Sequence, residues 1–403
     1  MATNNNDKTL NVPHLRFPEF SGEWENYKLQ DICNLLSGGT PALDNPNYWN
    51  GNIPFISAAT MHNSYIVDSE QYLSDEGLAR GSKLLQQGNL LLLVRGSMLW
   101  KHIPICYNKL DVAFNQDVKG IITNKFSRPL FLLYWFESHE SRMKYMVTGT
   151  GIGAGKLDTG TLLSMNVSLP SQKEQERIIS LLQLLDERIA TQNKIIDKLK
   201  SLIKGLIDDI ITLECGLLVT FETLYSKAGE GGTPTTSNMD FYDNGNIPFI
   251  KIEDLNNKYL LTNKDYITEL GLKKSSAWLI PTNSIIYSNG ATIGAISINK
   301  YPICTKQGIL GIIPNSNIDV EYLYYFMRSS YFQKEVERIV TEGTMKTAYL
   351  KDINHIKCPI PDSDKQKEIS HALSTLSLKE NIENQLLKKY QIQKQYLLSQ
   401  MFI

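Results

Sequence analysis

The chain has 403 residues, 42% of them hydrophobic and 21% charged, which favours two or three globular domains. The net charge of −1 argues against a protein that is basic throughout, although a local basic surface can still bind nucleic acid. The polar start lacks the pattern of a signal peptide and no apolar run reaches the roughly 18 residues of a membrane span, so we expect a cytoplasmic protein. Five scattered cysteines without a CxxC pair and histidines without an HExxH pattern argue against a disulfide framework and a metal site, and favour reduced structural thiols.

After an N-terminal arm (1–24), the sequence predicts a domain of mixed strands and helices over residues 25–170. Residues 89–96 (NLLLLVRG) form a short apolar run bounded by Asn and Gly, the pattern of a buried strand. Residues 128–146 carry apolar side chains at helical spacing. The phrase GNIPFI at residues 51–56 contains a proline, which predicts a strand start or a sheet edge.

A long helix is expected over residues 171–213. Ser171 and Glu174 follow Pro170 at the spacing of a capping box. Apolar residues then alternate four and three apart, and such a helix extends about 60 Å, more than one small domain covers. The seam positions are Ile178, Leu182, Leu185, Ile189, Gln192, Ile196, Leu199, Ile203, Leu206 and Ile210. Its balanced charges favour a spacer that docks proteins over a helix that grips phosphates, although a plain solvated face fits the charges equally well.

A second domain over residues 214–361 repeats the first. GNIPFI recurs at residues 245–250, and Gly-Gly-Thr-Pro occurs at residues 38–41 and again at residues 231–234. The offset between matches stays at roughly 190 to 200 residues, far above the period of a solenoid repeat. Further matches pair Asn89 with Asn283, Gly96 with Gly290, Cys106 with Cys304, Gln116 with Gln307, and Gln175 with Gln366. The pattern indicates one duplicated unit whose scaffold is shared and whose variable surface is not.

A final helix over residues 362–403 closes the second domain, with Ser363 and Gln366 at the capping spacing. Its seam is interrupted by Glu380, Glu383 and Lys394. We therefore expect an α+β protein with two duplicated globular domains, each followed by a long helix, the two helices packing as an antiparallel coiled coil. Extra apolar residues widen both helices, which allows a partner protein on the outer face as well as packing within the chain.

Several residues are candidates for contact with DNA. The Gly-Gly-Thr-Pro loops are either plain turns or elements that position a domain on a phosphate backbone. Base readout needs Arg, Lys, Asn or Gln at groove edges. The candidates are Gly38, Gly39, Thr40, Arg95, Lys101, Gln116, Lys119 and Lys156 in the first domain, and Gly232, Thr233, Lys251, Asn289, Lys306, Gln307 and Lys346 in the second. Because Gln116 and Gln307 repeat, a structural role is the alternative for these two.

Two motifs suggest catalysis or nucleotide binding without meeting its requirements. Asn45-Pro-Asn-Tyr48 is similar to the Asn-Pro-Pro-Tyr motif of adenine methyltransferases, but its third residue differs and its repeat partner lacks Asn-Pro, so we expect a turn. The glycine-rich residues 149–155 lack the GK[ST] of a phosphate loop, which leaves a flexible loop or one that approaches DNA phosphates with Lys156 or Lys346. No catalytic triad, carboxylate pair or nuclease centre is evident, so we expect a chain that is not an enzyme.

The order of motifs resembles the DNA-specificity subunit of type I restriction–modification systems. LRFPEFSGEW (15–24), the repeated Gly-Gly-Thr-Pro and IPFI phrases, MNVSLP (165–170), IKCPIP (356–361) and QYLLSQMF (395–402) carry this resemblance. It implies two target recognition domains that each bind half of a split double-stranded DNA site, held apart by the helices. It also implies partners that supply the chemistry: two modification subunits that methylate adenine with S-adenosylmethionine, and restriction subunits driven by ATP, with no cofactor in this chain. The alternatives are a self-sufficient methyltransferase and a scaffold that touches no DNA.

Overall fold

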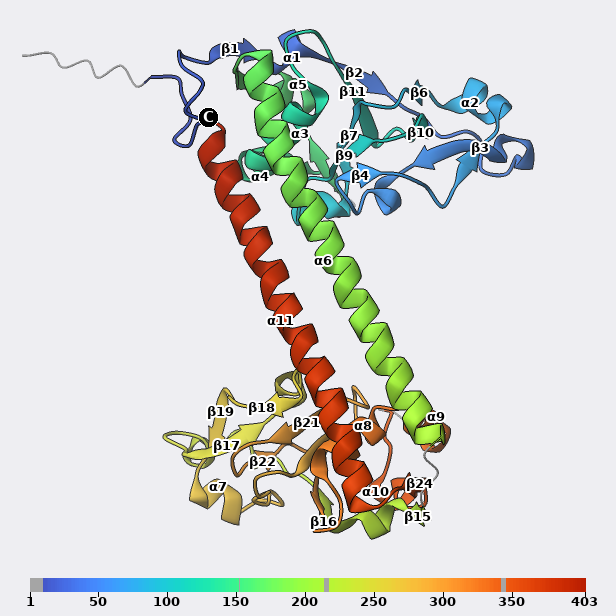
Figure 1. Ribbon diagram of the computed structural model, residues 1–403, viewed down its shortest axis with the longest axis vertical. Coiled ribbons are helices and arrows are strands. Elements are labelled where there is room, and N and C mark those ends of the chain that lie inside the picture. The colour runs from blue at the N-terminus through green and yellow to red at the C-terminus, as the bar shows by residue number, and fades with distance from the viewer. Residues whose placement is uncertain (1–9, 152, 214–216, 342–345) are drawn as a thin grey trace, which may run out of the picture. The chain divides into compact units, whose positions relative to one another are not determined.

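The structure is a computed structural model that describes residues 10–151, 153–213, 217–341 and 346–403. The chain divides into two compact units (Figure 1): the first comprises Met1–Gln192 with Leu386–Ile403, and the second comprises Asn193–Gln385. Two long helices, α6 (Gln172–Leu213) and α11 (Ser363–Met401), therefore contribute residues to both units. Among the described residues, no helix is both long enough and apolar enough to cross a membrane.

The first unit is built from short strands and helices around a five-stranded sheet. Its strands are β1 (Glu25–Lys28), β2 (Cys33–Ser37), β3 (Trp49–Ile56), β4 (Tyr65–Ile66), β5 (Tyr72–Leu73), β6 (Leu84–Leu85), β7 (Leu90–Leu93), β8 (Arg95–Gly96), β9 (Ile105–Asn108), β10 (Val112–Phe114), β11 (Val118–Thr123), β12 (Val147–Gly149), β13 (Gly155–Leu157) and β14 (Asn166–Leu169). Its shorter helices are α1 (Leu29–Ile32), α2 (Asp75–Gly81), α3 (Pro129–Ser138), α4 (Glu140–Lys144) and α5 (Thr159–Leu163). The sheet orders are β2-β11-β7-β9-β4, β5-β3-β10-β6 and β12-β13-β8, and β1 pairs with β14.

Strand β7 and helix α3 supply the centre of the first core. All four leucines of β7 are fully buried, as expected for a strand covered on both faces. Six consecutive residues of α3, from Phe131 to Phe136, are fully buried as well. The predicted strand is thus confirmed, and the predicted helix is present but interrupted at His139, where α3 gives way to α4.

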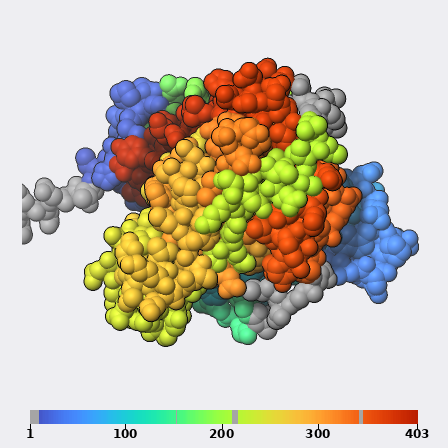
Figure 2. Space-filling model, turned by 90° about the horizontal axis from the view of Figure 1, so that it is seen from below, coloured from blue at the N-terminus to red at the C-terminus, as the bar shows by residue number. Residues whose placement is uncertain are grey.

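The second unit repeats this architecture. Its strands are β15 (Leu217–Thr220), β16 (Tyr225–Glu230), β17 (Ile247–Ile250), β18 (Tyr259–Leu260), β19 (Asp265–Ile267), β20 (Ile285–Ser288), β21 (Ile296–Asn299), β22 (Cys304–Thr305), β23 (Ile309–Pro314) and β24 (Lys357–Ile360). Its shorter helices are α7 (Glu269–Lys273), α8 (Val320–Met327), α9 (Ser330–Ile339) and α10 (Leu350–Ile353). The sheet order β16-β23-β20-β21-β18 matches that of the first unit strand for strand, and β15 lies beside β24 on the surface (Figure 2). The predicted duplication and α+β class are confirmed.

Strand pairing corrects part of the predicted repeat alignment. Phe55 of the first GNIPFI pairs with Ala113, whereas the equivalent Phe249 of the second pairs with Cys304. Cys304 is therefore the counterpart of Ala113, and the predicted match of Cys106 with Cys304 is wrong. The shared Pro-Ile-Cys letters run into two strands that are not equivalent, β9 and β22, so identity over these three residues does not indicate equivalent positions.

The GNIPFI phrase lies inside its sheets rather than at their edges. Strand β3 has β5 on one side and β10 on the other, and β17 is flanked by β19 and β22 in the same way. Of the two predicted positions, the sheet edge is therefore wrong, whereas the strand start is confirmed for the second copy, in which Pro248 is the second residue of β17. The parallel ladder with β10 or β22 begins one residue after the proline, at Phe55 or Phe249, so the missing N–H removes no bond from that ladder.

A buried glutamine fixes the start of each long helix to the domain that precedes it. Gln175 accepts a hydrogen bond from the Arg128 backbone N–H (2.9 Å) and donates to the carbonyls of Phe126 (2.9 Å) and Pro170 (3.1 Å). Gln366 repeats all three contacts, accepting from Asp319 N (2.8 Å) and donating to Asn317 O (3.3 Å) and Pro361 O (2.9 Å). This equivalence explains why the pair recurs in the sequence.

The helix caps differ between the two starts. Ser171 Oγ accepts from Glu174 N at 3.4 Å, as predicted. At α11 the cap is Asp362, whose Oδ1 accepts from the backbone N–H of Asp364 (3.1 Å) and Lys365 (2.9 Å), one residue before the predicted Ser363. A carboxylate at this position is a strong N-cap, because it satisfies the free N–H groups of the first turn.

Within the first unit the two long helices run antiparallel. Near the start of α6, Glu174 binds Arg16, whose neighbour Leu15 donates to the carbonyl of Gln400 near the end of α11. Further along α6, Asp186 binds Lys394, which lies earlier in α11. The described seam residues of α6 in this unit are mostly buried, Ile178, Leu182 and Leu185 among them. In the second unit, Ile203 and Ile207 of α6 share a core with Ile369 and Leu373 of α11.

Candidate nucleic-acid interface

The first Gly-Gly-Thr-Pro loop combines packed glycines with an exposed threonine. A Cβ atom on Gly38 would lie 2.2 Å from the carbonyl oxygen of Phe114, and one on Gly39 would lie 2.3 Å from that of Gly81. Glycine is required here because backbone approaches backbone. Thr40 is exposed and its hydroxyl donates to Gln116 Oε1 at 2.7 Å. The loop therefore presents Thr40 and Gln116 at the surface, while its glycines hold it to the domain.

The second loop is built in the same way. Side chains on Gly231 or Gly232 would collide with Thr305 or Ser276, at 2.1 and 2.2 Å. Thr233 Oγ1 accepts a hydrogen bond from the backbone N–H of Gln307 at 3.4 Å. The structure thus brings the predicted threonine and glutamine of each unit together, across a sequence distance of more than 70 residues in both cases.

Cations of the first unit gather beside the Thr40–Gln116 pair. Arg95 on β8 lies directly across from Lys156 on β13, so their side chains share one face of the small sheet β12-β13-β8. Asp117, next to Gln116, lies 3.9 Å from Arg95. Lys119 donates to Ser37 Oγ at 2.7 Å across β11 and β2. This surface, formed by Thr40, Arg95, Gln116, Lys119 and Lys156, is called the β8–β13 surface below.

Lys101 lies at the end of the 3-10 turn Ser97–Trp100 that follows β8, and it is exposed. The sequence analysis did not select its neighbour Trp100, which is 52% exposed. No repeat match pointed to this tryptophan, since the turn that carries it belongs to a stretch where the two units differ.

Backbone contacts identify what the second unit places at the same positions. Arg95 N and Gly290 N donate to equivalent carbonyls, Asp117 O and Gly308 O, at 3.3 and 3.2 Å. Gly290 forms a bridge with Thr347, as Arg95 pairs with Lys156. The counterparts of Arg95, Lys119 and Lys156 are therefore Gly290, Leu310 and Thr347. Because Gly290 matches Arg95, the predicted match of Gly290 with Gly96 is wrong by one residue. The second unit carries no charge at these three positions.

The predicted residues of the second unit have diverse surroundings. Lys306 and Gln307 are exposed after β22, and Lys346 is exposed. Lys251 binds Asp265 at 2.9 Å, and this hydrogen bond raises the pKa of the lysine. Asn289 is 1% exposed, and its amide donates to the Ala348 carbonyl at 3.2 Å, so in this structure it braces the backbone of the interior.

The motif that is similar to a methyltransferase signature has a structural explanation. Asn45 caps the 3-10 turn Pro46–Tyr48 by accepting from Asn47 N at 3.1 Å, and Asn238 does the same for Asp240 N at 3.1 Å. Asn45-Pro-Asn-Tyr48 is thus the turn that was expected.

Four cysteines are buried and unpaired, and burial raises the pKa of each to about 12, as expected of unreactive structural thiols; Cys215 lies outside the described residues. The described residues contain no group of His, Cys, Asp and Glu suited to a metal ion.

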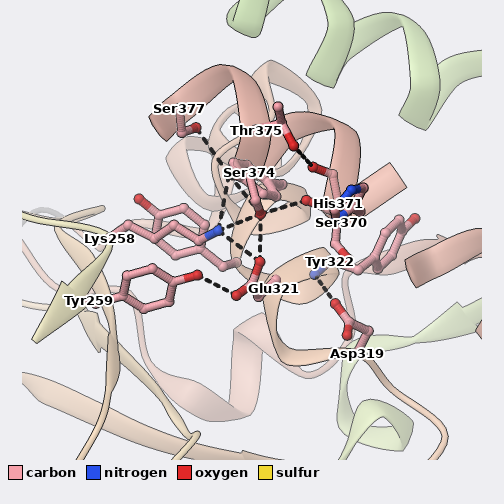
Figure 3. A network of polar contacts seen from close by, with 12 residues as sticks. Lys258, Tyr259, Asp319, Glu321, Tyr322, Ser370, His371, Ser374, Thr375 and Ser377 are labelled. Atoms are coloured by element: carbon pink, nitrogen blue, oxygen red, sulfur yellow. Dashed lines mark hydrogen bonds and ion pairs between the residues drawn. The ribbon is translucent and has the colours of Figure 1, made fainter. Parts of the chain in front are cut away.

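A polar network in the second unit joins the start of β18 and helix α8 to α11 (Figure 3). Lys258 Nζ donates to Glu321 (2.9 Å), Tyr325 (3.1 Å) and Ser374 (2.7 Å), and Tyr259 also donates to Glu321. Ser374 lies on α11 and donates to Glu321 at 2.5 Å. Each of these polar groups has a partner, so the cluster anchors the helix. No sequence pattern predicts this cluster, because its members lie far apart in the chain.

The family model for the type I restriction modification DNA specificity domain matches residues 21–201 and again residues 226–390. The chain belongs to this family. It is a specificity subunit of the type I restriction–modification class, and the two matched segments correspond to its two recognition domains. The resemblance inferred from the sequence motifs is confirmed.

Known specificity subunits resemble the chain, some over most of its length and one over less than half of it. The type I restriction enzyme MjaIX specificity subunit of Methanocaldococcus jannaschii is 23% identical over 363 residues, covering 84% of this chain and 83% of that protein. The EcoR124I/EcoR124II specificity subunit of Escherichia coli is 30% identical over 174 residues, 43% of each chain. The crystal structure of the S subunit from M. genitalium shares the fold with a TM-score of 0.60 at 16% identity, over 97% of this chain and 99% of that one.

Proposed function

We propose that the chain is the non-catalytic DNA reader of a type I complex, in which each recognition domain binds one half of a split site. Two modification subunits dock on the long helices and the domains and bring S-adenosylmethionine, and restriction subunits bring ATP-driven cleavage. The chain itself holds no cofactor and acts in the cytoplasm. The support is a pair of domains that share their buried scaffold and differ in the residues exposed at equivalent loops.

One turn carries this argument most clearly. Residues 57–60 and 251–254 form the same 3-10 turn directly after the two GNIPFI strands. Ser57 N donates to Thr60 Oγ1 at 3.1 Å, and Lys251 N donates to Asp254 Oδ2 at 2.9 Å. The backbone is the same, but the first turn is uncharged and the second carries Lys251, Glu253 and Asp254. One scaffold that displays different polar groups is what two readers of different half-sites require.

The decisive experiment maps methylated adenines in the DNA of a host that expresses this chain together with its modification subunit. We expect one bipartite motif, absent when this chain is omitted. If the complex is active but methylates no bipartite site, the proposal is wrong. The isolated chain should bind no measurable S-adenosylmethionine in calorimetry, and binding there would instead favour a self-sufficient methyltransferase.

A change in helix length tests the spacer role. One heptad is inserted between Gln192 and Asn193 and another between Gln385 and Leu386, where each helix passes from one unit to the other. A whole heptad preserves the apolar seam, so both domains keep their cores. The methylated motif should keep both half-sites and gain bases between them. An unchanged gap would show that the helices do not set the spacing.

A further inference from the structure

The glycine-rich segment at residues 149–155 has no role in the function proposed above, and its surroundings suggest one. Strands β12 and β13 form a hairpin that extends the sheet from β8. Thr150 closes it, donating from its backbone N–H and its hydroxyl to the carbonyl of Ala154, at 3.0 and 2.9 Å. The described residues of the segment are therefore a defined hairpin.

The glycines of this hairpin provide room for the turn that carries Trp100. A Cβ atom on Gly155 would lie 2.8 Å from a Val147 methyl and 3.1 Å from Cβ of Leu99. On the same face, a Cβ on Gly149 would lie 3.9 Å from the Trp100 ring, and the indole N–H donates to the carbonyl of Gly153 at 3.0 Å. The hairpin thus holds the tryptophan on its glycine face.

Trp100 is held in place but not buried. Its 52% exposure is unusual for tryptophan, which is highly buried on average and is enriched at interfaces when exposed. The hairpin already fixes the ring. A partner that binds it therefore restricts little further side-chain motion, and the entropic cost of binding is small. An aromatic ring presented in this way is suited to recognition.

The charges around the ring indicate what the partner is. Arg95 and Lys156 lie together on the opposite face of the hairpin sheet, both exposed, and Lys101 follows the tryptophan directly. Asp117 offsets part of the charge of Arg95 at 3.9 Å, and Asp158 is occupied as the cap of α5. The surplus of exposed cations around an apolar ring matches a polyanion that also presents apolar groups, as duplex DNA does with its phosphates and the thymine methyl groups of its major groove.

The second unit shows that this element belongs to the first recognition domain. The counterparts of Arg95 and Lys156 are Gly290 and Thr347. The connection between the equivalent strands is also longer in the first unit, residues 97–104 against residues 292–295, and Trp100 lies in the added length. Scaffold parts are shared by the two units, whereas the described residues place the tryptophan and the two cations in the first unit alone.

We propose that Trp100 is a specificity-determining residue that contacts base edges of the first half-site, positioned by strands β12 and β13, while Arg95 and Lys156 bind the flanking phosphates. This inference rests on the function proposed above. Trp100 supplies an apolar surface that packs against a thymine methyl group, and the two cations hold the domain on the DNA backbone.

The test uses the full chain in complex with its modification subunit and three DNA duplexes: the mapped bipartite site, one with the first half scrambled, and one with the second half scrambled. Trp100→Ala should lower the affinity for the intact site about ten-fold, which is the scale of one or two base contacts. The same variant should change the affinity for the duplex with the first half scrambled very little. Trp100→Phe should lose less, because it keeps the apolar ring and lacks only the bond to Gly153. Arg95→Gln and Lys156→Thr should weaken binding to all three duplexes equally and reduce the salt slope by about one each.

Three outcomes separate this inference from the proposed function. If the wild-type complex shows no preference for the bipartite site, the proposed function itself fails. If the wild type prefers the site and Trp100→Ala discriminates the duplexes equally well, the role of Trp100 is wrong. If Trp100→Ala and Trp100→Phe both release the modification subunit and keep the DNA preference, Trp100 is a protein contact and the inference is overturned. Thermal unfolding of each variant shows that the unit remains folded.

Discussion

The two recognition domains share sheet order, glycine contacts and the glutamine contacts at the helix starts, yet they differ at the three cations of the β8–β13 surface. Arg95, Lys119 and Lys156 stand where the second unit has Gly290, Leu310 and Thr347. By contrast, Gln175 and Gln366 make the same three hydrogen bonds in both units. The repeated glutamines at the helix starts are structural, so we expect specificity to reside in residues that do not repeat.

The contact between domain and helix pair also differs in its charges. In the first unit, Lys394 of α11 binds Glu137 (2.8 Å) and Asp186 (2.7 Å), and Tyr134 donates to Asp186 at 2.8 Å. In the second unit, Tyr325, the counterpart of Tyr134, contacts the hydroxyl of Ser377 at 3.0 Å instead. The first unit thus buries two carboxylates around one lysine, whereas the second buries one carboxylate and one lysine among hydroxyl groups.

The largest predicted effect is the loss of Lys394. Burial alone would lower the pKa of Lys394, but the two carboxylates overcome it and raise the pKa, so the lysine is charged and shared between them. Lys394→Met leaves two carboxylates buried without a cation, which should cost about 3–5 kcal/mol in the free energy of unfolding. Chemical denaturation of the variant measures the loss. The exposed Lys389→Met is the matched control, with an expected change within about 0.5 kcal/mol.

Adding Glu137→Gln to Lys394→Met should restore part of the lost stability, because one of the two unpaired charges is removed. If Lys394→Met is as stable as the control, the ion pairs add nothing to the first unit, and the contrast between the two helix contacts disappears.

The second prediction tests whether the repeated glutamines are equivalent. Gln175→Ala and Gln366→Ala each leave one buried N–H and two carbonyls without their partner, and each should lose about 2–3 kcal/mol. Denaturation should give similar values for the two variants, with little change for the exposed Gln333→Ala. A large loss in one unit and none in the other would show that the shared geometry hides different energetic roles.

How far the sequence predicts this molecule depends on whether a feature is local. The heptad seam and the duplicated scaffold follow from periodicity and repetition, and the structure confirms them. The β8–β13 surface does not follow, because Arg95 and Lys156 become neighbours only through strand pairing across some 60 residues. Trp100 was missed for a related reason: it lies where one unit has a longer connection, and a search for repeats passes over such stretches.

The smallest predicted effect concerns acid. Burial opposes ionisation of Glu321, but hydrogen bonds from Ser374 and Tyr259 and the ammonium of Lys258 outweigh it and lower its pKa. A carboxyl whose pKa is lowered on folding adds stability above its unfolded pKa near 4.5, and that stability is lost as the pH falls through the folded value. Glu137 behaves in the opposite way, because burial raises its pKa. Protonation of Glu137 at falling pH removes a buried charge and therefore stabilises the first unit.

Acid should therefore weaken the second network while relieving the first. In denaturation between about pH 6 and pH 3, Glu321→Gln should flatten the fall in stability by about 1 kcal/mol, a value kept small because Glu321 is partly exposed. Glu137→Gln should leave that fall unchanged or steeper, because it removes a group that gains from protonation. Equal slopes in both variants and the wild type would mean that neither carboxylate contributes to the acid response, and the two networks would then differ in composition but not in their dependence on pH.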